Sequence, residues 1–538
     1  MVCLLENLSN EIFYEIFDYL DGCELYHGFS NLNSRFHQLL NSPLLFYELK
    51  SHCTSNQFDE CMRYINPNQI RSFNVSSELR IDKFFSSFNI DSSLHHLRSI
   101  FVENIKPETL SDLLTNCTHL PCLTSLNIMS YHQLLDLCQI YPLIFNLSTL
   151  KSLTVTSHEF KNSMALPYAT ESQQTSKIEH MNINHRVTFQ ELATIISYTP
   201  KLFRLEFLHE DEDDSTVELI TPTQLSNITH ISMTIMYLNY DDMDIFLHKL
   251  PSTLESFNFF VCEIDISYLD FSMWEELIKE NFPQLKNFYF NYTATIPDEE
   301  EFIFTGCVLD QFVSPFWIAR QWFNQIIIRQ ESIAITIKPH KKRWYECLTT
   351  HSKLNINESS LLSIQYTPED QWLDVLYDEI EWVTDVATIY HLEMTGTFFI
   401  GVMGQIFNLL PDLHTFRISS ITLPTVTLLT DDELEQFIDA TTSNRITKVY
   451  LEKMNTFDDV LFLIDLFPRL ESLQIGCKSD IDIELFLHVI LIKINSKKSN
   501  LRLLAMRIPT ADDHIVKKIQ NLIDLTITRA NDTIFLRL

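Results

Sequence analysis

Residues 8–40 read LSNEIFYEIFDYLDGCELYHGFSNLNSRFHQLL, and this stretch predicts three short helices with more apolar surface than they can bury. The apolar side chains of the first helix spread over about 140° of its circumference, at roughly 100° per residue. They are Ile12, Phe13, Ile16, Phe17 and Leu20. A module of only about forty residues buries too little surface to be stable alone. The surplus apolar surface therefore predicts contact with a partner protein.

Helix-start signals divide this stretch into its helices. Asp21 stands three residues before Glu24, the spacing of a capping box, and Leu20 and Leu25 flank the cap as a hydrophobic staple. A third helix is predicted to begin near Asn31. The stretch therefore has the order helix, turn, helix, turn, helix.

This pattern resembles the F-box family, whose opening Leu-Pro stands here as Leu8-Ser9 and whose usual Trp of the third helix stands as Phe36. The residues that carry the resemblance are Leu8, Ser9, Asn10, Glu11, Ile12, Ile16, Phe17, Leu20, Leu25, Leu32, Asn33, Ser34, Arg35 and Phe36. The resemblance implies docking onto the Skp-family linker of a cullin-type ubiquitin ligase, with the rest of the chain choosing a protein substrate. The residues it implies for linker binding are Leu8, Ser9, Glu11, Ile12, Ile16, Phe17, Leu20, Leu25 and Phe36. The alternative is a plain helical cap on a larger domain.

Composition limits the classes of partner and compartment. The 538 residues carry a formal net charge of −32, which disfavours nucleic acid and anionic membranes as partners. Apolar runs are too short and interrupted to span a bilayer, and the eleven cysteines include no Cys-x-x-Cys pair. We therefore expect reduced thiols and a cytoplasmic protein. The basic run 340–343 leaves the nucleus open as an alternative, although such a run also fits a solvated loop.

From residue 70 onwards, three apolar residues recur at i, i+3 and i+5, with successive starts 24 to 31 residues apart in the first series. That series starts at Ile70, Leu97, Leu123, Leu150, Ile178, Leu202, Ile228, Leu254 and Leu285. A second series starts at Leu361, Ile389, Leu413, Ile446, Leu470, Leu501 and Leu522. Such self-similarity indicates a solenoid.

Each repeat predicts one strand and one helix. The last two apolar positions of a triplet alternate as in a strand. Capping boxes are predicted at Thr188 with Glu191, Ser272 with Glu275 and Thr430 with Glu433, and weaker forms at Thr456 with Asp459 and Thr510 with Asp513. A Pro-x-Leu motif is predicted to stop several helices and start the next strand. The pattern resembles long, helix-containing leucine-rich repeats. The expected fold is thus α/β, a small helical F-box followed by a leucine-rich-repeat horseshoe.

Four regions follow from these patterns. Residues 1–50 are assigned to the F-box, 51–296 to a first block of repeats, and 361–538 to a second block that ends in a strand cap. Residues 297–360 break the pattern and hold Trp317, Trp322 and Trp344. This segment is either an insertion that binds a ligand through its aromatic residues or a distorted repeat with large core residues.

The chain offers no motif for catalysis. It has only seven glycines, without phosphate-loop or dinucleotide spacing, and it lacks zinc-ligand and nucleophile-elbow motifs. We therefore expect no enzyme activity, cofactor or metal. Two functions remain, a ubiquitin-ligase substrate receptor and a non-catalytic repeat scaffold or inhibitor-like protein unconnected to ubiquitin.

The substrate is expected on the strand face of the repeats. Residues that alternate with the buried anchors point away from the core and would line the concave sheet. Their charges nearly cancel, so a strongly basic substrate is not implied. The residues expected to bind substrate are Phe101, Met129, Arg204, Phe260, Tyr289, Arg417 and Tyr450. Each aromatic residue could instead pair with a neighbouring strand.

Overall fold

The fold is given by a computed structural model of the chain. It describes residues 8–50, 53–88, 94–131, 135–158, 166–169, 176–210, 216–262, 265–295, 314–330, 332–341, 343–347, 360–365, 373–422, 445–478, 481–497, 499–509, 513–522 and 526–538.

The described residues confirm the α/β class. They form twenty strands, most of them paired in parallel, with helices between successive strands. The chain divides into two compact units. The first contains residues 1–258 and 280–285, and the second contains residues 259–279 and 286–538.

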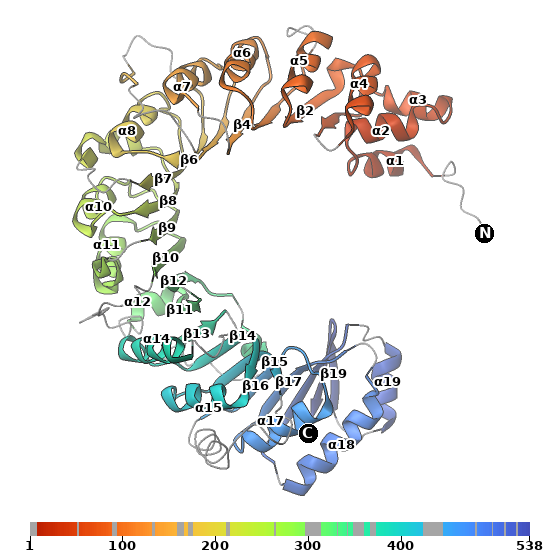
Figure 1. Ribbon diagram of the computed structural model, residues 1–538, viewed down its shortest axis with the longest axis vertical. Coiled ribbons are helices and arrows are strands. Elements are labelled where there is room, and N and C mark those ends of the chain that lie inside the picture. The colour runs from red at the N-terminus through yellow and green to blue at the C-terminus, as the bar shows by residue number, and fades with distance from the viewer. Residues whose placement is uncertain are drawn as a thin grey trace. The chain divides into compact units, whose positions relative to one another are not determined.

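The first unit begins with a helical module, residues 8–50, at the red end of the chain in Figure 1. Its elements are α1 (Asn10–Phe17), α2 (Gly22–Phe29), α3 (Ser34–Leu40) and β1 (Tyr47–Leu49). Helix α4 (Ser55–Tyr64) follows, and β1 pairs in parallel with the first repeat strand. The module is therefore joined to the sheet through its own backbone.

Seven parallel strands continue the first unit, with the helices on one side of them (Figure 1). The strands are β2 (Ile70–Val75), β3 (Ser99–Glu103), β4 (Ser125–Ser130), β5 (Ser152–Ser157), β6 (His180–Arg186), β7 (Arg204–Glu210) and β8 (His230–Met236). The helices are α5 (Glu78–Ser87), α6 (Pro107–Cys117), α7 (Leu137–Phe145), α8 (Phe189–Ser197), α9 (Pro222–Leu225) and α10 (Tyr240–Leu247), with short 3₁₀ turns at Pro67–Gln69 and Thr216–Leu219.

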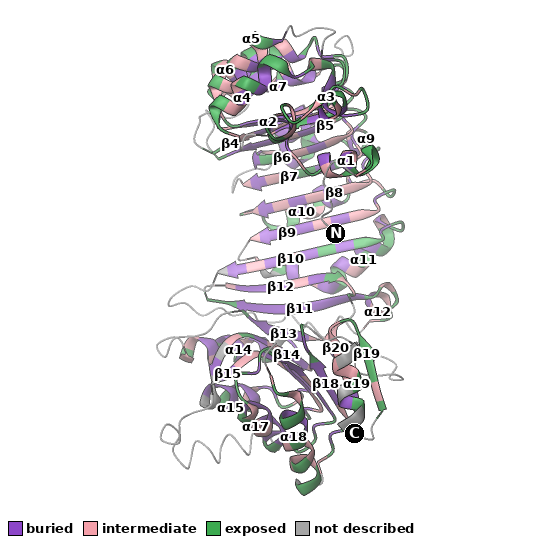
Figure 2. Ribbon diagram, turned by 90° about the vertical axis from the view of Figure 1, so that its right-hand side faces the viewer, coloured by how far each residue is buried: buried purple, intermediate pink, exposed green. Residues whose placement is uncertain are grey.

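The predicted apolar triplets form the core of these repeats. Every triplet of the first series is buried, from Ile70 to Phe290. Neighbouring strands hold them in register, so that Ile100 pairs with Leu126 and Leu126 with Leu153. Figure 2 shows the resulting alternation of buried and half-buried residues along β8.

Helix boundaries follow most of the predicted signals. The capping boxes at Asp21, Thr188 and Thr456 are present, and those predicted at Thr430 and Thr510 lie outside the described residues. The prediction at Ser272 is wrong, because α11 starts two residues earlier than a Ser272 cap requires, and the Asp270 carboxylate accepts the backbone N–H groups of Ser272 and Met273. A carboxylate is a strong N-cap acceptor, and here it occupies the position assigned to the hydroxyl.

The second unit contains the remaining strands. They are β9 (Ser256–Cys262, which includes the boundary between the units), β10 (Asn287–Thr295), β11 (Trp322–Arg329), β12 (Ser332–Pro339), β13 (Leu361–Ile364), β14 (His391–Phe399), β15 (Thr415–Thr422), β16 (Lys448–Leu451), β17 (Ser472–Gly476), β18 (Leu503–Arg507), β19 (Thr526–Ala530) and β20 (Thr533–Arg537). The helices are α11 (Phe271–Asn281, which also includes a boundary between the units), α12 (Pro315–Arg320), α13 (Trp344–Cys347), α14 (Leu373–Val386), α15 (Ile400–Leu409), α17 (Phe457–Leu466), α18 (Ile483–Lys497) and α19 (Asp513–Leu522), with a 3₁₀ turn at Ile266–Leu269.

The segment between the two series of triplets contributes an antiparallel hairpin to the sheet. Strand β12 pairs antiparallel with both β10 and β11, and β11 then pairs in parallel with β13. Trp317 and Trp322 are buried beside this hairpin, in contact with Phe288. These two tryptophans are therefore the large core residues of a distorted repeat.

The start of the second series at Leu361 is displaced by two residues. Leu361 pairs with His391, whereas Leu362 and Ile364 pair with the buried Leu392 and Met394. In the next repeat the first apolar residue, Ile389, precedes its strand by two positions. The corresponding residue here is 359, which lies outside the described part of the chain.

The chain ends in the predicted strand hairpin. Strands β19 and β20 pair antiparallel, and the turn residue Asn531 has a positive φ of 53°. The order differs from a simple continuation, because β20 lies between β18 and β19. Ile534 and Leu536 of β20 are fully buried, whereas most residues of β19 are exposed.

Two properties of the described part complete the fold. None of its helices has the length and apolar character needed to cross a membrane. Eight of the cysteines in it carry free thiols.

A truncation after Asp532 should cause aggregation, because it removes β20 and leaves the edge of β18 without a partner. Solubility and the midpoint of thermal unfolding measure the effect. The double variant I534D/L536D should behave in the same way, since it buries two charges. The control T526D/T528D changes exposed positions of β19 and should unfold like the wild type. A soluble truncation of unchanged stability would contradict the role of β20.

His185 predicts a loss of stability in mild acid. Its Nδ1–H donates to the Arg186 carbonyl and its Nε2 accepts from the Tyr141 hydroxyl at 2.7 Å, so the buried ring is neutral. Burial lowers the pKa of His185 to about 4 from an ordinary value of 6.5. As the pH falls from 7 to 5, the unfolded chain therefore binds a proton that the folded chain excludes. This difference costs about 2 kcal/mol.

The comparison that isolates His185 is wild type against H185Q, with unfolding measured at pH 7 and at pH 5. The wild type should lose about 2 kcal/mol more than the variant over this interval. Equal losses in the two proteins would show that His185 does not titrate differently in the folded state.

Candidate partner-binding surfaces

The helical module has a complete aromatic core of its own. Phe36 packs against Phe13 with ring centroids 4.9 Å apart, and Phe29 packs against Phe17 at 5.0 Å. The Phe29 and Phe36 rings are 5.3 Å apart and link the two pairs. The core thus contains one face of α1, and the other side chains of α1 remain outside it.

Arg35 fixes the start of α3 against the start of α1. Its guanidinium donates to the Leu8 carbonyl at 2.6 Å and to the Asn10 side chain at 2.7 Å, and it lies over the Phe13 ring. Residues just before α3, including Leu32, are therefore held near the first turn of α1. Charge-assisted contacts of this kind are stronger than neutral ones.

Polar contacts also hold the parts of the module together and join it to the first repeat. The Asp21 carboxylate accepts the Lys50 backbone N–H at 2.7 Å, in addition to capping α2. The buried Gln69 amide donates to the carbonyls of Leu40 and Leu45, each at 3.0 Å. Helices α2 and α3 are thus connected to the start of the sheet by hydrogen bonds from both sides.

The structure divides the predicted linker-binding residues by exposure. Phe17, Leu25 and Phe36 are buried in the module core. Leu8, Ile16 and Leu20 are half-buried, and Ser9, Glu11 and Ile12 are exposed. A hydrogen bond from Ser9 lowers the pKa of the Glu11 carboxyl, which is fully solvent-accessible. A partner could therefore touch the half-buried and the exposed residues directly, but not the three buried ones.

Two further apolar side chains belong to this exposed set. Leu32 is 55% exposed and Ile12 is 42% exposed, while Tyr19 protrudes almost completely. The sequence pattern included Leu32 but not among the binding residues, and it did not include Tyr19. Tyr19 and Leu32 lie in the loops after α1 and α2. Apolar residues in these loops are the sequence signal that could have added both to the predicted binding residues. We call Ile12, Tyr19 and Leu32, which belong to the segment of the three helices, the exposed apolar patch; Leu44 and Phe46, which precede β1, are exposed as well.

In the first unit, the predicted substrate-binding residues lie on the strand face opposite the buried triplets. Phe101 and Met129 are half-buried there, and Arg204 is exposed. The strand register places Phe101 in one row of side chains on this face. That row is Asn74, Phe101, Asn127, Thr154, Asn182, Glu206 and Ser232. The face is mostly uncharged and polar.

Phe260 and Tyr289 are the exposed aromatic residues of β9 and β10. Phe260 is 38% exposed and Tyr289 is 39% exposed, although their neighbours Phe259 and Phe290 are buried. The alternation of strand side chains thus leaves both rings on the outer face of the sheet.

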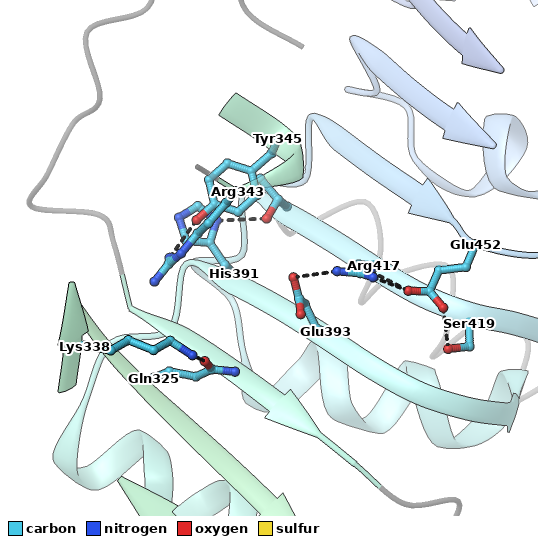
Figure 3. A network of polar contacts seen from close by, with 10 residues as sticks. Gln325, Lys338, Arg343, Tyr345, His391, Glu393, Arg417, Ser419 and Glu452 are labelled. Carbon is cyan, nitrogen blue, oxygen red and sulfur yellow. Dashed lines mark hydrogen bonds and ion pairs between the residues drawn. The ribbon is translucent and has the colours of Figure 1, made fainter. Parts of the chain in front are cut away.

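In the second unit, the predicted residue Arg417 is the centre of a charged network (Figure 3). Its guanidinium bonds the Glu452 carboxylate at 2.7 Å and reaches Glu393 at 3.4 Å, and Ser419 donates to Glu452 at 2.9 Å. Burial opposes the charge, but the two glutamates outweigh it and raise the pKa of Arg417. The Arg417 side chain is therefore already paired with carboxylates of the same chain.

Helix α13 and the residue before it cover part of this strand face. Tyr345 stacks on His391 at 4.2 Å, and Trp344 packs on Tyr450 at 5.6 Å. Tyr450 also lies under Arg417 and is only 6% exposed. Of the residues predicted to bind substrate, Tyr450 is thus covered by the chain itself.

A pocket of about 340 Å³ lies beside α13 in the second unit. Its lining residues are Phe323, Gln325, Lys338, Pro339, His340, Lys341, Arg343, Trp344, Leu361, Glu393 and Arg417. Among these lining residues, Arg417 is the one that the strand pattern predicted to bind a substrate. The basic run beside Trp344 was the available signal, but it also fits a solvated loop or an import signal.

Compared with known proteins, the chain matches no protein-family model and no curated protein. Within the described residues, no cluster of three or more His, Cys, Asp or Glu side chains is suited to hold a metal ion. The surfaces that remain as candidate sites are the exposed apolar patch, the strand face and the pocket.

Proposed function

We propose that this chain is a substrate-recognition subunit of a Skp-cullin-F-box ubiquitin ligase. The helical module binds the Skp-family linker, the linker connects it to a cullin, and the repeats bind a protein substrate. The repeats are leucine-rich repeats, and the chain positions the substrate without catalysing a reaction itself. It is therefore a non-catalytic subunit that acts in the cytoplasm, with the nucleus as an alternative.

One observation carries this proposal, the exposed apolar patch on a module whose core is already complete. Ile12 and Leu32 expose apolar surface although Phe13, Phe17 and Phe36 fill the core. Burying a large apolar side chain is worth about 1.5–3 kcal/mol. A partner that covers the patch would therefore gain several kcal/mol.

The attachment of the module supports a role in positioning. Gln69 joins it to the first repeat through buried hydrogen bonds, and within the module Asp21 links α2 to the residue after β1. A ligase subunit must connect its linker-binding module to its substrate-binding repeats, and these hydrogen bonds make that connection at the start of the sheet.

The second candidate is a non-catalytic leucine-rich-repeat scaffold or inhibitor-like protein unconnected to ubiquitin. The uncharged polar strand face of the first unit fits either function equally. The two candidates differ in one property, which is binding of the linker by the module.

The double variant I12D/L32D should lose binding to a purified Skp-family linker by tenfold or more, because two charges replace apolar contacts. Capture of the linker by the full-length chain measures this. Phe17 is unsuitable for the test, because it is buried and a charge there would unfold the module.

The matched control is L79D, which places a charge at a residue of α5 that is 81% exposed and lies outside the module. It should bind the linker like the wild type. Unchanged binding by I12D/L32D would contradict the proposed interface, and absence of binding by the wild type would favour the scaffold.

The double variant F260A/Y289A should weaken substrate capture while leaving linker binding intact. Both rings are exposed on the strand face, and exposed aromatic residues often dominate the energy of an interface. Proteins captured from the native source, with the proteasome inhibited, would be compared between variant and wild type. Loss of capture only on charge reversal of the helices would place the substrate elsewhere.

A further inference from the structure

The pocket of the second unit is strongly cationic in an acidic protein. Four of its lining side chains are positively charged, namely Lys338, Lys341, Arg343 and Arg417. Its one carboxylate is Glu393, which Arg417 already contacts. The lining therefore carries a positive excess, whereas the whole chain carries −32.

Hydrogen-bond donors also exceed acceptors in this lining. The Lys338 ammonium donates to the Gln325 side-chain oxygen and so uses that acceptor, as Figure 3 shows. Among the described residues, neither Lys338 nor Lys341 forms an ion pair. Hydrogen bonds from charged donors are stronger than those from neutral ones. A ligand rich in acceptor oxygens would complement the lining.

The cations are close enough to oppose one another. Burial lowers the pKa of Lys338, the positive charges of Arg343 and Lys341 lower it further, and Glu393 partly compensates. Arg343 is held in place by its hydrogen bond to the Tyr345 hydroxyl at 2.7 Å and lies over the Phe323 ring. An anion placed between these groups would replace repulsion with attraction.

We propose that this pocket binds a phosphate monoester. A phosphate group carries about −1.5 to −2 charges at pH 7 and three acceptor oxygens, which match Lys338, Lys341 and Arg343 better than one carboxylate would. The volume lies within the range of organic ligands, about 300–1,000 Å³, so the pocket holds more than the phosphate. Phe323, Pro339, Trp344 and Leu361 supply apolar surface for the ester's organic part.

This proposal does not depend on ubiquitin ligation, because it rests on the pocket alone. The ester could be a free small molecule or a phosphorylated side chain of a bound protein. Both present the same chemistry to the pocket. The source is therefore decided by comparing probes.

Calorimetric titration of the full-length chain tests the proposal with three probes: inorganic phosphate, phenyl phosphate and an alanine-rich peptide with one phosphotyrosine. Phenol and the unphosphorylated peptide are the neutral controls. We expect phenyl phosphate or the phosphopeptide to bind more tightly than inorganic phosphate, and the neutral controls not to bind. Binding by the peptide alone would assign the ester to a protein. Failure of all three phosphate probes would overturn the proposal.

Charge variants of the lining separate the pocket from other basic surfaces. K338M and K341A should each weaken binding by about tenfold or more, as expected for a lost hydrogen bond to a charged group. The exposed Lys453 lies outside the lining, so K453A should bind like the wild type. E393Q should bind more tightly, because it removes the opposing carboxylate. A damaged fold would not produce this gain.

Two further measurements place the ester in the pocket. Binding should tighten as the pH rises from 5.5 to 7.5, because the ester gains its second negative charge near pH 6. Bound ester should also change tryptophan fluorescence, and W344F should lose most of this change. Binding that K338M, K341A and E393Q all leave unaltered would show that the ester is held elsewhere.

Discussion

The alternation of side chains along each parallel strand is the constraint on which the rest of the structure depends. Ile100, Leu126 and Leu153 meet in register across three strands, and each is buried. A slip of one residue would move every such anchor to the opposite face and lose about 1.5–3 kcal/mol for each one. The core therefore fixes the register, and the register in turn fixes which residues face a partner. The polar row that contains Phe101 has its position because the apolar row beside it must be buried.

Two antiparallel hairpins interrupt the parallel order in the same way. In each, the second strand inserts next to the preceding repeat, as β12 does beside β10 and β20 beside β18. The first strand is thereby displaced outward, where β11 pairs with β13. At the end of the chain, β19 takes this outer place and exposes Thr526, Thr528 and Arg529. Polar and charged residues at such an edge discourage further strand pairing. The same device thus continues the sheet in one place and ends it in the other.

The sequence predicts what is local and periodic, and it fails where distant segments meet. The triplets, the capping boxes at Asp21 and Thr188 and the final hairpin depend on residues a few positions apart, so their signals lie in short windows. The register predicted at Leu361 is wrong because this residue is apolar and buried without belonging to a triplet. It lines the pocket instead. Tyr450 satisfied every criterion for an exposed strand residue. It is covered because α13, from a segment about a hundred residues earlier, packs on it, and no periodicity encodes that contact.

Net charge is also a poor guide to the chemistry of one pocket. The charge of −32 acts on a long polyanion along its whole length, and it disfavours nucleic acid for that reason. A small anion responds mainly to charges within about 8 Å at physiological ionic strength, because salt screens the more distant ones. In the pocket lining, Lys338, Lys341, Arg343 and Arg417 outnumber the one carboxylate, Glu393. An acidic chain can thus repel polyanions and still hold a single phosphate ester, provided that its basic residues are gathered in one place. In this chain, three of the four cations of the lining come from the six consecutive residues 338–343. The aromatic residues Phe323 and Trp344 line the same pocket.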